Sequence, residues 1–259
     1  MAFPLRLASI DCGGPRLHAT VRGPGGGPAV ALADPFAEEK KCAHRVMAEV
    51  ATALAEDGVT VLRFDYRGTG DSEGEFEDVT LEDWREDLRA AVAWARAELA
   101  PTTLGLVGVR LGATLAAEMA GAVGADGLTL LAPILDGRAY WEENFRRQLI
   151  KARITEGEGA SAEDLRRAAD EETFDLGGWV VTRRMREQIE ALKLPIASTV
   201  EQCRVVDVSA RTTPSPAMAA LAASYARGEV VALRMEPFWQ RIGLIDATPL
   251  IDVLRQDAV

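Results

Sequence analysis

The chain has few of the residues on which disulfide-rich, metal-binding and histidine-dependent proteins rely. Its 259 residues include only two histidines, His18 and His44, and three cysteines, Cys12, Cys42 and Cys203. The cysteines form neither a C-x-x-C pair nor a zinc-binding spacing, and an odd number does not suit a set of disulfides. We therefore expect free thiols, no bound metal and a reducing, cytoplasmic location.

Long apolar segments and an excess of positive charge are also missing. No stretch approaches the roughly 20 apolar residues that cross a bilayer. The start, MAFPLRLASIDCGG, lacks the basic and apolar regions of a signal peptide. The formal net charge of -11 argues against nucleic acid or an anionic membrane as a partner. Because P-loop, H-E-x-x-H and helix-opening G-x-G-x-x-G motifs are absent too, we expect no cofactor.

Short apolar runs alternate with long amphipathic stretches along most of the chain. The expected strands are 29–33, 59–65, 104–109, 128–132, 204–209 and 230–235, after a hairpin of 3–11 with 16–21. The expected helices between them are 42–56, 81–99 and 111–123. This alternation predicts an α/β fold with a mainly parallel central sheet flanked by helices. Ligands of such sheets bind beyond the carboxyl ends of the strands.

Residues 136–195 break the alternation. They are rich in arginine and glutamate and predict several helices without a strand, one of them beginning at Ser161. We expect a helical cap here, over a core formed by 1–135 and 196–259. Two later helices should begin at Ser215-Pro216 and Thr248-Pro249, because a hydroxyl residue before proline is typical of a helix start.

The stretch GLVGVRLGA, residues 105–113, predicts a strand, a glycine-flanked turn and a helix. α/β-Hydrolases place a nucleophilic serine at the centre of such a turn, in G-x-S-x-G. Here the pattern is Gly108-Val109-Arg110-Leu111-Gly112. An arginine cannot attack a carbonyl, because it keeps its proton at working pH. It can hold a carboxylate or phosphate, or close the former site with an internal salt bridge, and both interpretations stay open.

The other members of a serine triad are missing from their expected places. The triad histidine follows the last strand, where this chain reads LRMEPFWQRIG, residues 233–243. The triad acid would follow the preceding strand, where the chain reads VSARTTPSP, residues 208–216. Ser72, in the glycine-rich loop RFDYRGTGDSEG, is better interpreted as a turn or capping serine than as a nucleophile.

A dense group of functional side chains follows the strand 29–33, in ADPFAEEKKCAHR, residues 33–45. In α/β-hydrolases the loop after this strand supplies an oxyanion-hole N–H. The candidate site residues of this segment are Phe36, Glu38, Glu39, Lys40 and His44. Acids before cations at a helix start also suit the helix macrodipole, which accounts for some of these charges without a site.

Four motifs in order carry a resemblance to a known family: P-F-A-E-E, G-x-G-D-S-x-G, G-x-R-x-G and a late P-F-W. Together they resemble the exosortase A system-associated hydrolases of the second type, a serine-aminopeptidase-like branch of the α/β-hydrolases, over about residues 30–245. The resemblance implies an α/β-hydrolase fold. The matching positions are Pro35, Phe36, Ala37, Glu38, Glu39, Arg110, Pro237, Phe238 and Trp239. The chain departs from the family pattern at Lys40-Lys41-Cys42.

These residues support one leading hypothesis, an enzyme without a serine nucleophile. Arg110 would hold a small anionic or acyl substrate, with Phe36, Lys40, His44 and Trp239 as further substrate contacts. A glutamate whose pKa is raised by burial would act as general acid or base. The candidates for this role are Glu38, Glu39 and Glu236, the last of which could also orient Arg110.

Two alternatives remain. The first is a catalytically inactive pseudo-hydrolase that binds or scaffolds a partner, with the site closed by a pair such as Arg110–Glu236. The second is a hydrolase with a displaced nucleophile, Cys42 or Ser209, with His44 as the base for Cys42. Residues two apart on a helix point in different directions, which disfavours a Cys42–His44 contact. A homodimer is compatible with all three.

Overall fold

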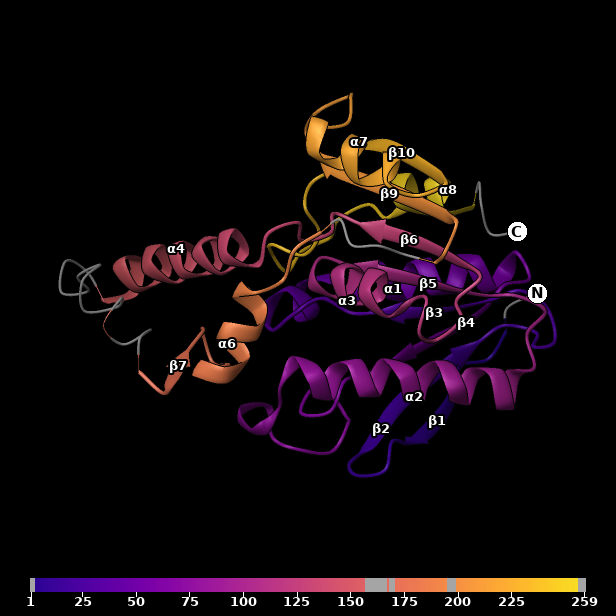
Figure 1. Ribbon diagram of the computed structural model, residues 1–259, viewed down its shortest axis with the longest axis horizontal. Helices are drawn as coiled ribbons and strands as arrows, with labels where there is room; N and C mark the ends of the chain where they lie inside the picture. The colour runs from indigo at the N-terminus through magenta and orange to yellow at the C-terminus, as the bar shows by residue number, and fades with distance from the viewer. Residues whose placement is uncertain (1–2, 157–166, 168–170, 195–198, 256–259) are drawn as a thin grey trace.

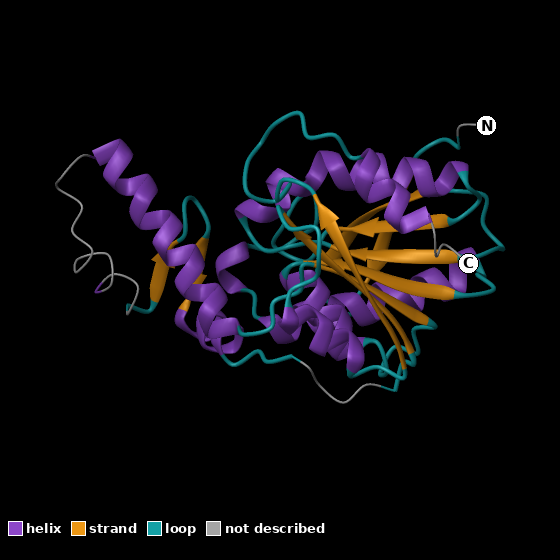
Figure 2. Ribbon diagram, turned by 90° about the horizontal axis from the view of Figure 1, so that it is seen from above, coloured by secondary structure: helices purple, strands orange, loops and turns teal. Residues whose placement is uncertain are grey.

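The computed structural model describes residues 3–156, 167, 171–194 and 199–255. Eight strands form one twisted sheet in the order β1-β2-β4-β3-β5-β6-β9-β10, with helices on both faces (Figure 2). The strands are β1 (Arg6–Asp11), β2 (Arg16–Arg22), β3 (Ala29–Ala33), β4 (Thr60–Phe64), β5 (Leu104–Val109), β6 (Gly127–Leu131), β9 (Gln202–Ser209) and β10 (Arg227–Arg234). Among the strand pairings of this eight-stranded sheet, those of β2 with β1 and β4 are antiparallel and the others are parallel, so the predicted mainly parallel sheet is confirmed.

Apart from the short η1, each helix that flanks the sheet buries apolar side chains against it. The helices of this layer structure are α1 (Glu38–Glu56), α2 (Leu81–Leu99), α3 (Leu111–Met119), α7 (Pro216–Ala223), α8 (Thr248–Arg255) and the short η1 (Phe76–Asp78). α1 and α8 share one core cluster with β-strand residues such as Val107 and Val206. α2, α3 and α7 contribute to the cluster on the other face, which contains Trp84 and Leu115. Two cores on opposite faces are the arrangement expected for parallel strands buried on both sides.

Local sequence signals explain the helix starts. Thr80 caps α2 in a capping box with Asp83, and each side chain satisfies an amide that the first helical turn leaves unpaired. Ser215 caps α7 with Pro216 in the first turn, as predicted. α8 begins at Thr248. α1 begins at Glu38, four residues before the predicted start, so the acidic pair of the lead-in belongs to the helix.

The described elements between residues 137 and 194 extend beyond the carboxyl ends of the strands (Figure 1). They include α4 (Gly137–Glu156), β7 (Thr173–Asp175), β8 (Val180–Thr182) and α6 (Arg183–Glu190). The prediction of helices without a strand was wrong, because β7 and β8 pair as an antiparallel hairpin. Its turn needs Gly177 and Gly178, which have φ values of 70° and 96° that only glycine adopts freely. The expected helix start at Ser161 lies outside the described residues.

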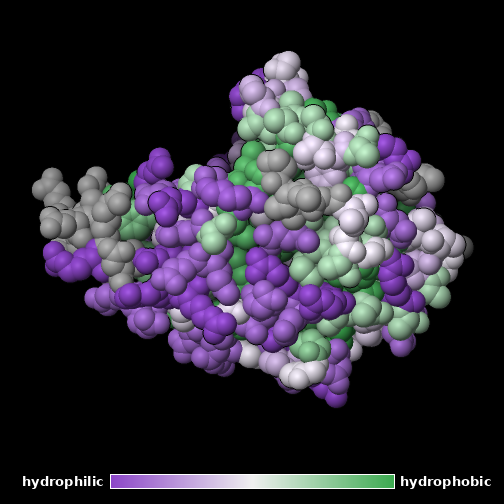
Figure 3. All heavy atoms as spheres, viewed as in Figure 1, coloured by the Kyte–Doolittle hydropathy of each residue, from purple (hydrophilic) through white to green (hydrophobic). Residues whose placement is uncertain are grey.

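One face of this segment is polar, although Ile150 and Ile154 of α4 are exposed. Figure 3 shows hydrophilic side chains over most of the face formed by α6 and the neighbouring end of α2. Within the described ranges, no helix is both long enough and apolar enough to cross a membrane.

Candidate functional site

The turn between β5 and α3 has the sharp geometry that the glycine pattern predicts. Arg110 lies at its centre with φ 54° and ψ -117°, a backbone conformation that costs a non-glycine residue of order 1–3 kcal/mol. A Cβ added to Gly108 would lie 2.3 Å from Cα of Ala113, and one added to Gly112 would lie 2.2 Å from the carbonyl oxygen of Ala33. Both positions therefore require glycine, and the turn packs directly against α3 and the end of β3.

The Arg110 side chain is held from several directions. Its Nε donates to Oε1 of Glu39 at 3.2 Å, and its Nη2 donates to Oε2 of Glu143 at 3.1 Å. The guanidinium carbon lies 5.3 Å from the ring centre of Tyr140 and 5.2 Å from that of Trp239, within cation–π range. Burial disfavours the charged form, but Glu39, Tyr140 and Glu143 outweigh it and raise the pKa of Arg110. The guanidinium is therefore a fixed cation.

Glu39 is the buried anion opposite this cation. Its side chain is only 3% exposed, and its Oε2 accepts a hydrogen bond from the Tyr140 hydroxyl at 2.9 Å. Nη1 of Arg147 approaches Oε1 at 3.4 Å. Burial raises the pKa of Glu39, while Arg110, Arg147 and the Tyr140 hydroxyl act in the opposite direction. The carboxyl group is thus desolvated but has three donors around it.

A second carboxylate, that of Glu143, contacts the same arginines. Glu143 accepts from both Arg110 and Arg147, the latter one helical turn later on α4. We call Arg110, Glu39, Glu143 and Arg147 the elbow network. Its two cations and two carboxylates balance in charge, which offsets the desolvation of the buried members Arg110 and Glu39.

A cavity of about 280 Å³ lies beside the elbow network. We call it the elbow cavity; it is lined by Ala37, Glu38, Glu39, Asn144, Arg147, Gln148, Lys151, Leu176, Gly177, Trp239 and Gln240. Its volume is near the lower end of the roughly 300–1,000 Å³ typical of small-molecule sites. The four lining residues from α4 have the spacing i, i+3, i+4, i+7, so one polar face of that helix forms a wall.

The sequence profile of the X-Pro dipeptidyl-peptidase (S15) family matches residues 13–191, more than half of the chain. The chain belongs to this family. No curated protein sequence matches it. Several α/β-hydrolase structures are similar to it.

Est1E from Butyrivibrio proteoclasticus, solved with ferulic acid bound, superposes with a TM-score of 0.69 at 19% identity over 96% of both chains. Alpha/beta hydrolase domain-containing protein 10 from mouse gives 0.63 at 17% identity over 97% of each chain. XC6422 from Xanthomonas campestris, described as an α/β serine hydrolase without a lid, gives 0.59 at 19% identity over 99% of this chain and 95% of its own. These similarities confirm the α/β-hydrolase fold.

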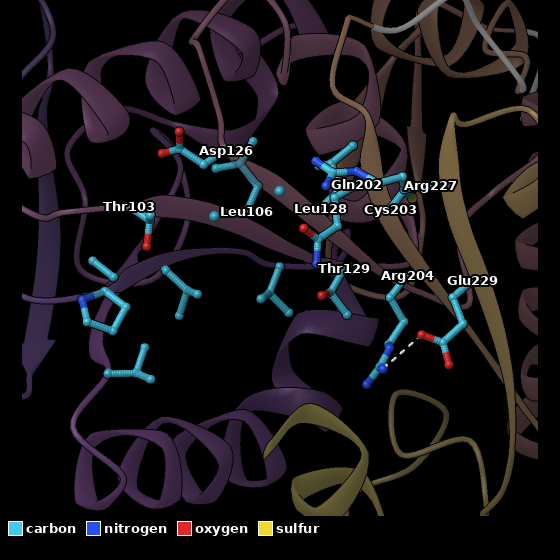
Figure 4. A pocket seen from close by; sticks show the side chains of 17 residues that line it. Thr103, Leu106, Asp126, Leu128, Thr129, Gln202, Cys203, Arg204, Arg227 and Glu229 are labelled. Carbon is cyan, nitrogen blue, oxygen red and sulfur yellow. Dashed lines mark hydrogen bonds and ion pairs between the residues drawn. The ribbon is translucent and has the colours of Figure 1, made fainter. Parts of the chain in front are cut away.

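A larger cavity of about 360 Å³ lies at the end of the sheet opposite the elbow cavity. Figure 4 shows Thr103, Asp126 and Gln202 around it, with an ion pair between Arg204 and Glu229 at its rim. Thr103 and Asp126 directly precede β5 and β6, and Gln202 is the first residue of β9, so this cavity lies at the amino ends of the strands. Because ligands of open α/β sheets bind at the carboxyl ends, the elbow cavity is the better candidate site.

The structure brings some of the predicted site residues to the elbow cavity. Glu38, Glu39 and Trp239 line it, whereas Arg110 lies behind Glu39 in the elbow network. Phe36 is buried and does not line the elbow cavity; its ring packs 5.7 Å from those of Phe76 and Trp84, in the core.

Lys40 lies in a different cluster. Its Nζ forms ion pairs with Asp65 and, at 3.3 Å, with Asp34, and it contacts the Thr69 hydroxyl. Lys40 therefore does not line the elbow cavity, because its ammonium is buried between two carboxylates at the ends of β3 and β4. Lys40 outweighs the effect of burial and lowers the pKa of Asp65.

Glu236 and His44 lie on the surface. The carboxylate of Glu236 pairs with Arg241, so the expected Arg110–Glu236 pair is wrong and Glu39 takes that place. Nδ1 of His44 lies 3.4 Å from Nη2 of Arg63. Partial burial and Arg63 lower the pKa of His44, which disfavours the charged imidazolium.

The surroundings of Cys42 and Ser209, the candidates for a displaced nucleophile, do not activate either side chain. Burial raises the pKa of the Cys42 thiol, which disfavours the reactive thiolate. The Ser209 hydroxyl oxygen accepts a hydrogen bond from the backbone N–H of Arg211 at 3.1 Å. Ser72 donates to the carbonyl oxygen of Asp65 at 2.6 Å and accepts the His18 amide, as its interpretation as a turn serine predicts.

Tyr140, Glu143 and Arg147 are the site residues that the sequence reasoning missed. All three lie on α4, directly after the strand that follows the elbow. The spacing of Glu143 and Arg147 is a helical ion-pair signal, but such pairs are common on exposed helices. Their role depends on contacts with residues 110 and 39, far away in the sequence.

Proposed function

We propose that this hydrolase-like protein binds a small anionic or acyl molecule in the elbow cavity and does not process it through a serine acyl-enzyme. The position of Arg110 carries the proposal. It occupies the centre of the elbow, and its guanidinium is fixed by Glu39 and Glu143 at 3.2 and 3.1 Å. A permanently protonated side chain cannot be the nucleophile. The resemblance to the exosortase A system-associated hydrolases, with their G-x-R-x-G motif, agrees with this proposal.

The inventory of bases supports the same conclusion. The chain has two histidines; His18 lies in strand β2 and His44 on the exposed side of α1. Neither follows the last strand, where the triad base of a serine hydrolase is found.

The lining of the elbow cavity favours a polar or anionic ligand with an apolar part. Arg147 and Lys151 contribute two cations from one helix face, and Trp239 contributes an aromatic wall. The buried indole N–H of Trp239 has no hydrogen-bond acceptor within the described residues. An unpaired buried donor costs about 1–3 kcal/mol, so a ligand acceptor that reached it would gain affinity.

A thermal-shift screen of carboxylates, phosphates and acyl thioesters tests the proposal. A ligand of the folded state at a hundredfold its Kd stabilises by about 2.7 kcal/mol. We expect hits with wild type and with Arg89→Gln, an exposed arginine of α2, and weaker binding by Arg147→Gln. The proposal fails if no compound binds, or if a fluorophosphonate probe labels one serine stoichiometrically.

A second candidate function, acid–base catalysis by Glu39, has one observation in its favour. Glu39 lines the elbow cavity and burial raises its pKa, as is usual for catalytic carboxyl groups. If the ligand is turned over, Glu39→Gln should abolish turnover and retain binding. Unchanged turnover in Glu39→Gln would exclude this candidate and leave a binding role.

We further propose a cytoplasmic location and a homodimer, which fractionation and light scattering test.

A further inference from the structure

We infer that Glu143 is an internal substitute for the carboxylate of the ligand, and that a bound carboxylate replaces it on Arg147. This inference rests on the proposed function, because it requires a small molecule in the elbow cavity. It adds the chemical class of the ligand and a residue that competes with it.

The two carboxylates of the elbow network differ in how firmly they are held. Glu39 is 3% exposed and has donors from Arg110, Arg147 and the Tyr140 hydroxyl. Glu143 is 42% exposed and is held by the two arginines. Water can solvate the Glu143 carboxylate after it leaves, whereas Glu39 would remain desolvated. Glu143 is therefore the exchangeable anion of the pair.

Arg147 connects the elbow cavity with the elbow network. It lines the cavity and at the same time contacts both Glu39 and Glu143. Lys151, one turn further along α4, and Gln148 line the same wall. A carboxylate that enters the cavity meets these donors before it can meet Arg110, which lies deeper.

The contacts of Arg147 explain why the ligand should exchange with Glu143 rather than add to it. Arg147 already contacts Glu39 through Nη1 and Glu143 through Nη2. A third carboxylate on the same guanidinium would lie close to two like charges, which disfavours its charged form. Movement of Glu143 into water removes one of these charges and leaves its place on Arg147 to the ligand.

The geometry points to a carboxylate as the ligand group. Glu143 places one oxygen on each of two guanidinium groups, and the planar donor fork of arginine fits a planar carboxylate. A ligand carboxylate can reproduce the contact with Arg147 while Arg110 keeps Glu39.

The test compares Glu143→Gln with Glu49→Gln by titration calorimetry. Glu49 is a matched control because it is also 42% exposed and also pairs with an arginine four residues away, Arg45. The probes are acetate, ferulate and the neutral methyl ester of ferulate. We expect Glu143→Gln to bind both carboxylates at least fivefold more tightly than wild type, and the ester equally. Glu49→Gln should match wild type.

The outcomes separate this inference from the proposed function. Equal carboxylate affinities in wild type and Glu143→Gln overturn the competition, while the proposed function stands. Binding of the ester without either carboxylate overturns the ligand class, and the proposed function again stands. If neither these probes nor the wider panel binds, both fail. Glu143→Ala, which also removes the charge, must repeat the gain if Glu143→Gln folds poorly.

Discussion

Removal of the Arg110 guanidinium should be among the most destabilising single changes in the elbow network. The variant Arg110→Met keeps an apolar stem of similar length but leaves Glu39, 3% exposed, without its nearest cation. Breaking a buried ion pair on one side costs about 3–5 kcal/mol. Because Tyr140 and Arg147 still donate to Glu39, we expect the lower end, about 3 kcal/mol.

A double-mutant cycle isolates the interaction free energy between Arg110 and Glu39. Glu39→Gln leaves Arg110 with Glu143 as a half-exposed partner, so its cost should be about 2 kcal/mol. The double variant Arg110→Met/Glu39→Gln removes both charges of the pair, so neither side chain leaves the other as an unpaired buried charge. Its loss of unfolding free energy should therefore be about 2 kcal/mol smaller than the sum of the two single losses, within the usual range for contacting residues.

Urea unfolding at pH 7, followed by circular dichroism and tryptophan fluorescence, measures these free energies. The exposed pair of Arg45 and Glu49 provides the control, and Arg45→Met should cost less than about 1 kcal/mol. An Arg110→Met variant within 1 kcal/mol of wild type, or costs that simply add, would refute the view that Arg110 and Glu39 depend on each other.

Two further predictions concern the loops around the site. Lys40 lowers the pKa of Asp65 in the folded state, so the stabilisation from Asp65 is present above its unfolded pKa near ~3.9 and disappears as the pH falls through the folded value. Asp65→Asn should therefore have a lower free energy of unfolding than wild type at pH 7, and the difference should shrink below about pH 4. A difference in unfolding free energy that stays constant between these pH values would contradict the prediction. Gly112→Ala places a Cβ 2.2 Å from a backbone oxygen and should cost about 3 kcal/mol or more. Gly14→Ala, where a Cβ meets nothing within 4 Å, should be neutral within about 0.5 kcal/mol, and equal melting of the two variants would exclude a close approach at the elbow.

The sheet could be predicted because its signals are local. The apolar runs at 29–33 and 104–109 match β3 and β5, and the glycines at 108 and 112 predict a tight turn without knowledge of the fold. The β7–β8 hairpin was missed although Gly177-Gly178 lies between alternating apolar residues, a typical hairpin signal. The charged composition around it favoured helices.

The partners of Arg110 could not be predicted from local patterns. The sequence placed a glutamate at 236, near the vacated histidine position, but its backbone turns that side chain outward to Arg241. Glu39 was a candidate because it follows the strand 29–33, and the structure places it beside Arg110. Its partner Tyr140 and the competing Glu143 come from α4, and only the packing of α4 over the elbow brings them within reach.

The strained backbone at Arg110 indicates what the elbow does in this protein. A φ of 54° with ψ of -117° persists only where the surroundings force it, and here Gly108 and Gly112 pack too closely against α3 and the end of β3 to admit a side chain. In a serine hydrolase that turn presents a nucleophile to the substrate. In this chain it presents a cation that joins α1, through Glu39, to α4, through Glu143. Since α4 forms a wall of the elbow cavity, the elbow fixes the position of that wall. Exchange of Glu143 for a ligand would release one of these links, while the Tyr140–Glu39 hydrogen bond would keep α4 on the core.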